Sequence, residues 1–158
     1  MNSDMFRFVD LSDAEVDALE ARYGPLGSSL RELVDAAIGL RNAVAPPMDV
    51  ISAENGDTRA DVHLGAAYEG PPGMVHGGVS ALLLDHLMGV TASRMSKVTF
   101  TGTLTLRYRN PLPLGRVVLT GRVSGEEGRK VFVTAEIEGD HGVAVEAEGV
   151  FIVPIWSE

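Results

Sequence analysis

The chain has 158 residues, 45% of them hydrophobic, which is enough to bury the core of one globular domain. Its formal net charge of −9 argues against a nucleic acid or an anionic membrane surface as its general partner. The absence of cysteine excludes disulfide bonds, a thiolate nucleophile and a cysteine-based zinc site.

The first 47 residues are expected to form a helical extension ahead of a domain at 48–158. A capping box at 12–15 opens a short helix, and a second box at 29–32 opens a longer amphipathic helix. We interpret both helices as a structural N-terminal extension of the following domain. The alternative is that they cover a ligand pocket or extend the dimer interface.

The start of the chain does not resemble a secretory leader. It lacks a basic segment followed by an apolar core, and no run reaches the roughly 20 apolar residues that a bilayer crossing needs. We therefore expect a cytoplasmic location.

From residue 48 the apolar period becomes that of strands. Residues 49–53 and 58–64 are predicted to form a hairpin around Asn55-Gly56-Asp57. Residues 97–109 are polar at odd positions and mostly apolar at even positions, as in a strand with one buried face. Three more strands are predicted at 116–124, 129–138 and 143–153, separated by glycine-containing turns at 125–128 and 139–142.

A helix is predicted between the hairpin and the long strand. Gly70-Pro71-Pro72-Gly73 opposes helix and residues 80–84 favour it, so the helix should begin near Gly77-Gly78. Its first amide N–H groups and its dipole would suit a developing oxyanion. The whole pattern predicts an α+β fold in which an antiparallel sheet wraps around this helix, although other α+β folds fit it as well.

One carboxylate, Asp85, interrupts the apolar run of this helix. Burying an unpaired carboxylate costs several kcal/mol, so Asp85 is expected to face a site; capping of a neighbouring element is the structural alternative. His76 and Asp85 are nine positions apart, or about 13 Å along one helix. Two antiparallel copies of the helix would bring the two ends together, which predicts a homodimer with two composite sites.

The segment from Tyr68 to Gly78, with an acid nine residues after the His of its His-Gly-Gly, resembles the hot-dog-fold acyl-CoA thioesterases of the PaaI type. Its Gly-Pro-Pro-Gly loop is similar to that of one branch of this family. The resemblance continues through 106–115 and 127–132 and covers about residues 48–153. It implies a hot-dog fold, a homodimer that pairs into a homotetramer, and hydrolysis of an acyl-CoA to the free acid and CoA without a cofactor or a metal.

The resemblance also implies a role for several residues. Asp85 would be the catalytic carboxylate, either as general base on water or as nucleophile through a mixed anhydride. The backbone N–H of Gly77 would be the oxyanion donor, and His76 would shape the same pocket. Thr101, seven residues before Tyr108, would hold the water or the carboxylate; a place on the polar face of the strand is the alternative.

CoA would need local positive charge in this acidic chain. Its expected contacts are Gly78, Arg129, Lys130 and Arg109, with Arg94 and Arg107 as further candidates and a solvated charge as the alternative for each. Gly70 stands where many PaaI-type enzymes carry an Asn or Gln that orients the attacking water, so that water-activation scheme is in doubt for this chain.

Two other functions remain open at this point. One is a non-catalytic hot-dog protein that binds acyl-CoA as a sensor or scaffold. The other is a hot-dog hydratase or dehydratase acting on acyl thioesters, although the longer Asp and His motif of such enzymes is not found in the sequence.

Overall fold

The computed structural model describes residues 45–93 and 98–155. The chain divides into two compact units, residues 1–47 and 48–158, and every described helix and strand belongs to the second unit. The two expected N-terminal helices lie outside the described residues and stay a prediction. No described helix combines the length and hydropathy that a membrane crossing requires.

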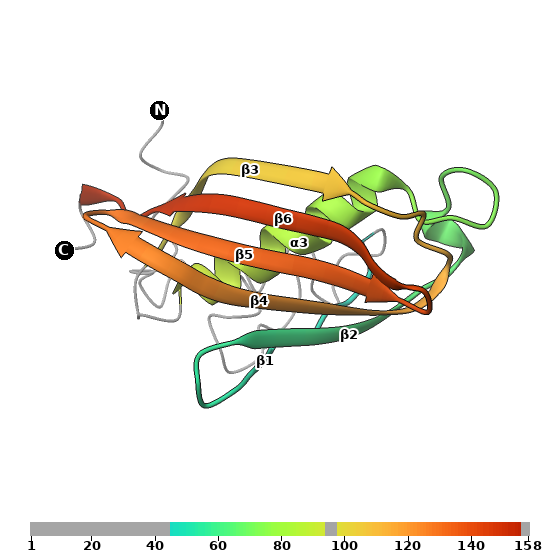
Figure 1. Cartoon of the computed structure of the whole chain (residues 1–158), viewed down its shortest axis with the longest axis horizontal. Coiled ribbons are helices and arrows are strands. Elements are labelled where there is room, and N and C mark those ends of the chain that lie inside the picture. The colour runs from blue at the N-terminus through green and yellow to red at the C-terminus, as the bar shows by residue number, and fades with distance from the viewer. Residues whose placement is uncertain (1–44, 94–97, 156–158) are drawn as a thin grey trace, which may run out of the picture. The chain divides into compact units, whose positions relative to one another are not determined.

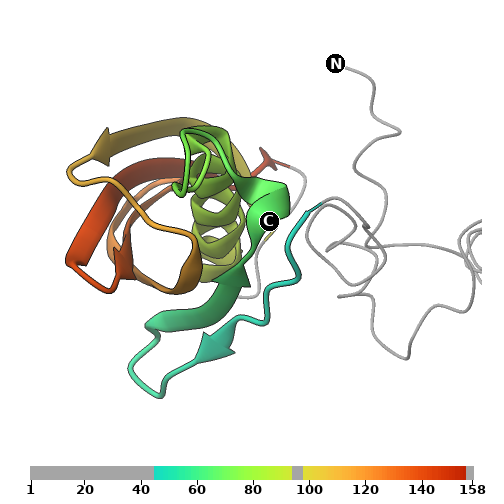
Figure 2. The ribbon, with the colours of Figure 1, turned by 90° about the vertical axis from the view of Figure 1, so that its right-hand side faces the viewer.

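Six strands form one antiparallel sheet with the order β1-β2-β4-β5-β6-β3. One long helix, α3 (Gly77–Ala92), lies in the curve of this sheet (Figures 1 and 2). The predicted antiparallel sheet around one central helix is therefore confirmed. The strands are β1 (Ile51–Ser52), β2 (Thr58–Leu64), β3 (Phe100–Tyr108), β4 (Gly115–Glu127), β5 (Lys130–Gly139) and β6 (Gly142–Ile152).

The hairpins follow the predicted turns with one shift. The turn around Asn55 joins β1 to β2, although β1 is only two residues long. The predicted turn at 125–128 is wrong in its position, because β4 continues to Glu127 and the chain reverses at Gly128, whose φ is 58°. A bulge between Val123 and Gly125 lets the β4–β5 pairing run through this glycine-containing stretch.

The core lies between the helix and the inner face of the sheet. Alternate residues of the central strands point inward, as the period of two requires, and meet a continuous apolar face of α3. The largest fully buried side chains are Leu64, Leu83, Leu84, Leu87, Met88, Val117, Leu119, Val133, Ile137, Val145 and Phe151.

The expectation of a buried face on β3 is only partly correct. Leu104 and Leu106 are half-buried, and Tyr108 is 56% exposed. β3 is the edge strand beyond β6, whereas α3 packs mainly against β4 and β5. The inner face of β3 is therefore incompletely covered within one chain.

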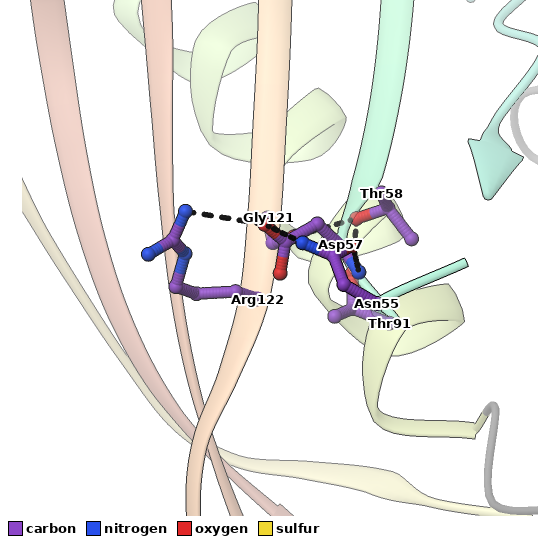
Figure 3. A network of polar contacts seen from close by, with 6 residues as sticks. All are labelled: Asn55, Asp57, Thr58, Thr91, Gly121 and Arg122. Carbon is purple, nitrogen blue, oxygen red and sulfur yellow. Dashed lines mark hydrogen bonds and ion pairs between the residues drawn. The ribbon is translucent and has the colours of Figure 1, made fainter. Parts of the chain in front are cut away.

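A buried polar contact fixes the C-terminal end of α3 to the sheet (Figure 3). Thr91 donates to the carbonyl of Leu87 over 2.7 Å, and its Oγ1 lies 2.6 Å from Thr58 Oγ1. Thr58 Oγ1 also lies 3.2 Å from the carbonyl oxygen of Gly121. A Cβ on Gly121 would come within 2.9 Å of Thr58 Oγ1, so only glycine fits there. Strands β2 and β4 thus hold the helix in one place.

Candidate active site

The loop before α3 is folded against His76. The N–H of His76 donates to the carbonyl of Tyr68 over 2.9 Å, and Glu69 Oε1 accepts from the N–H of Gly73 over 2.6 Å. A Cβ on Gly70 would lie 2.8 Å from the Cα of His76. A side chain at position 70 would therefore displace His76. Glycine fits this position, where many PaaI-type enzymes carry an Asn or Gln.

His76 is the N-cap of α3. Its backbone is extended, with φ −62° and ψ 133°, and its Nδ1 accepts from the N–H of Gly78 over 2.9 Å. The neutral imidazole therefore carries its proton on Nε2. The N–H of Gly78 is therefore used within the chain, and the contact of Gly78 with CoA stays a prediction.

The first turn of α3 leaves one amide without an acceptor. Val79 and Ser80 both donate to the carbonyl of His76, over 3.0 and 3.3 Å, and Gly78 donates to the His76 ring. Among the described residues, no group accepts from the N–H of Gly77. Gly77 therefore offers a free donor at the positive end of the helix dipole.

Asp85 lies on the half-exposed side of α3 and contacts β3. Thr101 Oγ1 donates to Asp85 Oδ1 over 2.8 Å. The pair brings together two residues predicted as site residues, 16 positions apart in sequence. The carboxylate is thus held in place from one side without being sealed in the core.

A β-bulge turns Thr101 toward the helix. Thr101 is opposite Phe151, which is buried against α3, whereas Thr103 is opposite Val150 on the outer face of the sheet. The register shifts between Thr101 and Thr103, so Gly102 is the extra residue. The alternative of Thr101 on the outer polar face is therefore wrong, because the bulge reverses the phase of the strand.

The two halves of the site do not meet within one chain. Gly77 and Asp85 are eight residues apart on α3, which corresponds to about 12 Å along the helix axis. The free amide and the Thr101–Asp85 pair are therefore too far apart to act on one carbonyl carbon.

Tyr108 is a site residue that sequence reasoning did not assign. Its hydroxyl donates to the carbonyl of Gly77 over 2.8 Å. The alternation of β3 had placed Tyr108 among the buried apolar positions, yet it is 56% exposed. The only sequence signal for Tyr108 was its spacing of seven residues after Thr101.

The candidate cations for CoA differ in how far they are engaged. Arg109 pairs with Glu146 at 2.8 Å, Arg107 pairs with Glu148 at 3.2 Å, and Arg129 donates to the carbonyl of Val153 over 3.3 Å. Lys130 is exposed, and no described carboxylate pairs with it. Arg94 lies outside the described residues.

The start of α3, where Gly77 lies, and the start of β5, where Lys130 lies, are near opposite ends of the sheet in one chain (Figure 1). Lys130 pairs with Ile152 on β6. Ile152 in turn pairs with Phe100 at the start of β3. Tyr108, which contacts Gly77, ends that strand. Eight residues of strand separate Phe100 from Tyr108, which is about 26 Å.

A hollow of about 740 Å³ lies on the outer face of the sheet. Its lining includes three arginines and four carboxylates, and neither Asp85 nor Gly77 contributes to it. Among these charges, Arg122 pairs with Asp57 and Arg107 pairs with Glu148. On the same face Arg116 donates to Asp61, and this hydrogen bond raises the pKa of Arg116. The charged lining residues are Asp57, Arg59, Arg107, Arg122, Glu136, Glu146 and Glu148. We place the candidate site at Asp85 and Gly77 because these residues carry the positioned carboxylate and the free backbone donor, and neither of them lines the hollow.

Within the described residues, no group of three His, Asp or Glu side chains is arranged to hold a metal ion. His63, His76 and His141 come from different parts of the fold, and His76 uses its Nδ1 on the backbone.

The chain is similar to proteins of one superfamily. The family model described as Thioesterase superfamily matches residues 72–146. A protein of known crystal structure, described as a thioesterase superfamily protein, shares 35% sequence identity with this chain. The match covers 96% of this chain and 79% of that chain, with a TM-score of 0.72. The predicted hot-dog fold is confirmed by this match.

One further similar protein is named for an activity, and another was solved with a bound ligand. Acyl-coenzyme A thioesterase THEM4 of Xenopus laevis is 41% identical over 91 residues, which are 56% of this chain and 41% of that protein. The chain thus spans about two fifths of the length of this curated relative. A Streptococcus mutans protein solved with acetyl-CoA is 18% identical, over 68% of this chain and 88% of that chain, with a TM-score of 0.63. At that identity it shows the fold alone.

Proposed function

The chain belongs to the thioesterase superfamily, and we propose that it hydrolyses an acyl-CoA to the free acid and CoA, as an enzyme of the PaaI type. The observation that carries this proposal is the carboxylate of Asp85, held by Thr101 at 2.8 Å on a half-exposed helix surface. The similarity to an acyl-CoA thioesterase supports the substrate class. The Gly-Pro-Pro-Gly loop of this chain supports the PaaI subtype.

Two routes use the same residues. As general base, Asp85 takes a proton from water, the water oxygen bonds to the thioester carbon, and CoA leaves as the thiolate, which then takes up a proton. As nucleophile, Asp85 bonds to the thioester carbon and expels the thiolate, and water then hydrolyses the mixed anhydride. In both routes the carbonyl oxygen becomes negative and accepts from the N–H of Gly77.

The proposed site needs a second copy of the chain. The exposed side of α3 carries Gly78, Leu82 and Asp85 at helical spacing, and Leu82 is 38% exposed. β3 beside it is an edge strand with a half-covered apolar face. Two antiparallel helices packed through these surfaces in a homodimer would bring Gly77 of one chain beside Asp85 of the other.

We further propose that the dimers pair into a homotetramer and that the protein acts in the cytoplasm. The resemblance to the PaaI type supports the tetramer. Light scattering of the full chain should give a mass near four chains, and cell fractionation should recover the protein with cytoplasmic markers. A dimeric mass or recovery in another fraction would contradict these two proposals separately.

The function is tested by measuring thiol release from acyl-CoAs of different chain length and type. Because the chain has no cysteine, a thiol-reactive chromophore added to the assay reports only the CoA that is released. We expect steady turnover with at least one acyl group. Tight acyl-CoA binding with no thiol release from any substrate would make the protein a sensor, and consumption of an enoyl-CoA without thiol release would make it a hydratase.

A second test concerns the nucleotide end of CoA, for which Lys130 is the proposed phosphate contact. Lys130→Ala should raise KM by about tenfold while kcat changes little, because the phosphates bind alike in the ground and transition states. The effect should shrink as salt rises, since screening already weakens the contact in the parent protein.

Arg122→Ala is the matched control for this test. It removes the same charge, but Arg122 is paired with Asp57 on the outer face of the sheet. Lys130 alone is tested first because the guanidinium of Arg129 also holds the Val153 carbonyl, so its removal has a structural cost. Equal KM values for both variants would place the nucleotide elsewhere.

A further inference from the structure

We propose that Tyr108 is a positioning residue for the oxyanion donor: its hydroxyl fixes the first turn of α3 so that the N–H of Gly77 points toward the substrate. This inference rests on the proposed hydrolase function. The contact that carries it is the 2.8 Å hydrogen bond from Tyr108 Oη to the carbonyl of Gly77.

The start of α3 would be loose without an external contact. Two consecutive glycines, Gly77 and Gly78, occupy its first two positions, and glycine gives the backbone the widest choice of conformations. The first turn of any helix also lacks the incoming hydrogen bonds that hold its interior. An oxyanion donor, in contrast, must lie about 2.7–3.1 Å from the position that the oxyanion will occupy.

Hydrogen bonds hold both peptide groups that flank the Cα of Gly77. On one side, the His76 carbonyl accepts from Val79 and Ser80. On the other side, the peptide joining Gly77 to Gly78 is held at its oxygen by Tyr108 and at its N–H by His76 Nδ1, over 2.9 Å. Among the described residues, the N–H of Gly77 is the one group of these two peptides without a hydrogen-bond partner.

Hydrogen bonds to β6 hold Tyr108 and the residues after it. It is opposite Val145 on β6, and the next residue, Arg109, donates its N–H to the carbonyl of Ala144 over 2.8 Å. Its neighbour Asn110 donates its side-chain amide to the carbonyl of Val143 over 2.9 Å. One hydroxyl group therefore ties the helix start to the edge of the sheet.

Packing within one chain does not explain this tyrosine. Its side chain is more than half exposed, so it contributes little to the core. A Cβ on Gly77 would lie 3.5 Å from Tyr108 Cε1, an ordinary contact, so the ring lies beside the glycine without excluding a small side chain. The hydroxyl is the group that acts on the backbone.

The test is Tyr108→Phe, which keeps the ring and removes one hydroxyl. We expect kcat to fall about tenfold with KM within about twofold, which is less than the 10² to 10³ expected for loss of an oxyanion donor outright. In the same variant, amide exchange of Gly78 should accelerate, because the peptide loses the hydrogen bond that ties its oxygen to the sheet. The thermal midpoint should stay within a few degrees of the parent.

Two further variants make the result specific. Tyr68→Phe removes the same group from the other described tyrosine, whose hydroxyl has no hydrogen bond among the described residues, and should change neither kcat nor exchange. Gly77→Ala combined with Tyr108→Phe should recover part of the lost kcat, because alanine restricts the backbone that the hydroxyl had restrained.

An unchanged kcat in Tyr108→Phe would overturn the proposal, and so would a raised KM with unchanged kcat, which would make Tyr108 a direct substrate contact. Unchanged exchange of Gly78 would overturn it as well. If the parent protein released no thiol, the hydrolase function would fail, and the exchange measurement would still test whether Tyr108 holds the helix start.

Discussion

Replacing Asp85 by Asn is expected to lower kcat by about 10² to 10⁴, the usual loss when a general base is removed. Asparagine keeps the size of the side chain, and its carbonyl oxygen can still accept from Thr101 Oγ1. In the parent protein Thr101 Oγ1 lies 2.8 Å from Asp85 Oδ1. It can neither take a proton from water nor attack the thioester carbon. The loss should therefore appear in kcat for every acyl group that the parent protein hydrolyses.

The same assay separates this chemical loss from damage to the fold. Asp61→Asn is the matched control, because Asp61 is also an aspartate on the protein surface but pairs with Arg116 on the outer face of the sheet. Its kcat should equal that of the parent, and circular dichroism should be the same for all three proteins. Nearly full turnover by Asp85→Asn would make Asp85 a structural partner of Thr101 only.

Replacing Gly77 by Pro is expected to lower kcat by about 10² to 10³, because it deletes the single free amide at the helix start. Proline is well accepted as the first residue of a helix, and the extended ψ of His76, 133°, suits a residue before proline. The helix should therefore persist without its donor. Gly77→Ala keeps the N–H and should lose far less activity than Gly77→Pro.

Mixing inactive subunits tests whether the site is composite. Asp85→Ala and Gly77→Pro subunits refolded together should regain about a quarter of the parent activity, since half of the dimers are mixed and each mixed dimer holds one intact site. Each variant refolded alone should stay inactive. A mixture that stays inactive although mixed dimers are present would mean that each chain supplies its own complete site.

The amino-acid sequence by itself determined where the helix begins and which carboxylate leaves the core. The proline-rich loop cannot be helical and the residues after Gly78 favour helix, so the start at Gly77 follows from local preferences. Asp85 had to reach the surface because an unpaired carboxylate in an apolar run is too costly to bury. The sheet order could be expected only through the resemblance, because alternation gives strands but not their neighbours.

Only the tertiary structure decided how the side chains around the helix are used. Thr101 stands at one of the polar, odd positions of the strand, and a bulge at Gly102 turns it toward Asp85. Tyr108 belongs to the apolar set of the same strand, yet its place at a sheet edge leaves it exposed and within reach of Gly77. A bulge depends on pairing with β6, and an edge depends on which strands lie beside it, so both are properties of long-range contacts that a local pattern does not contain.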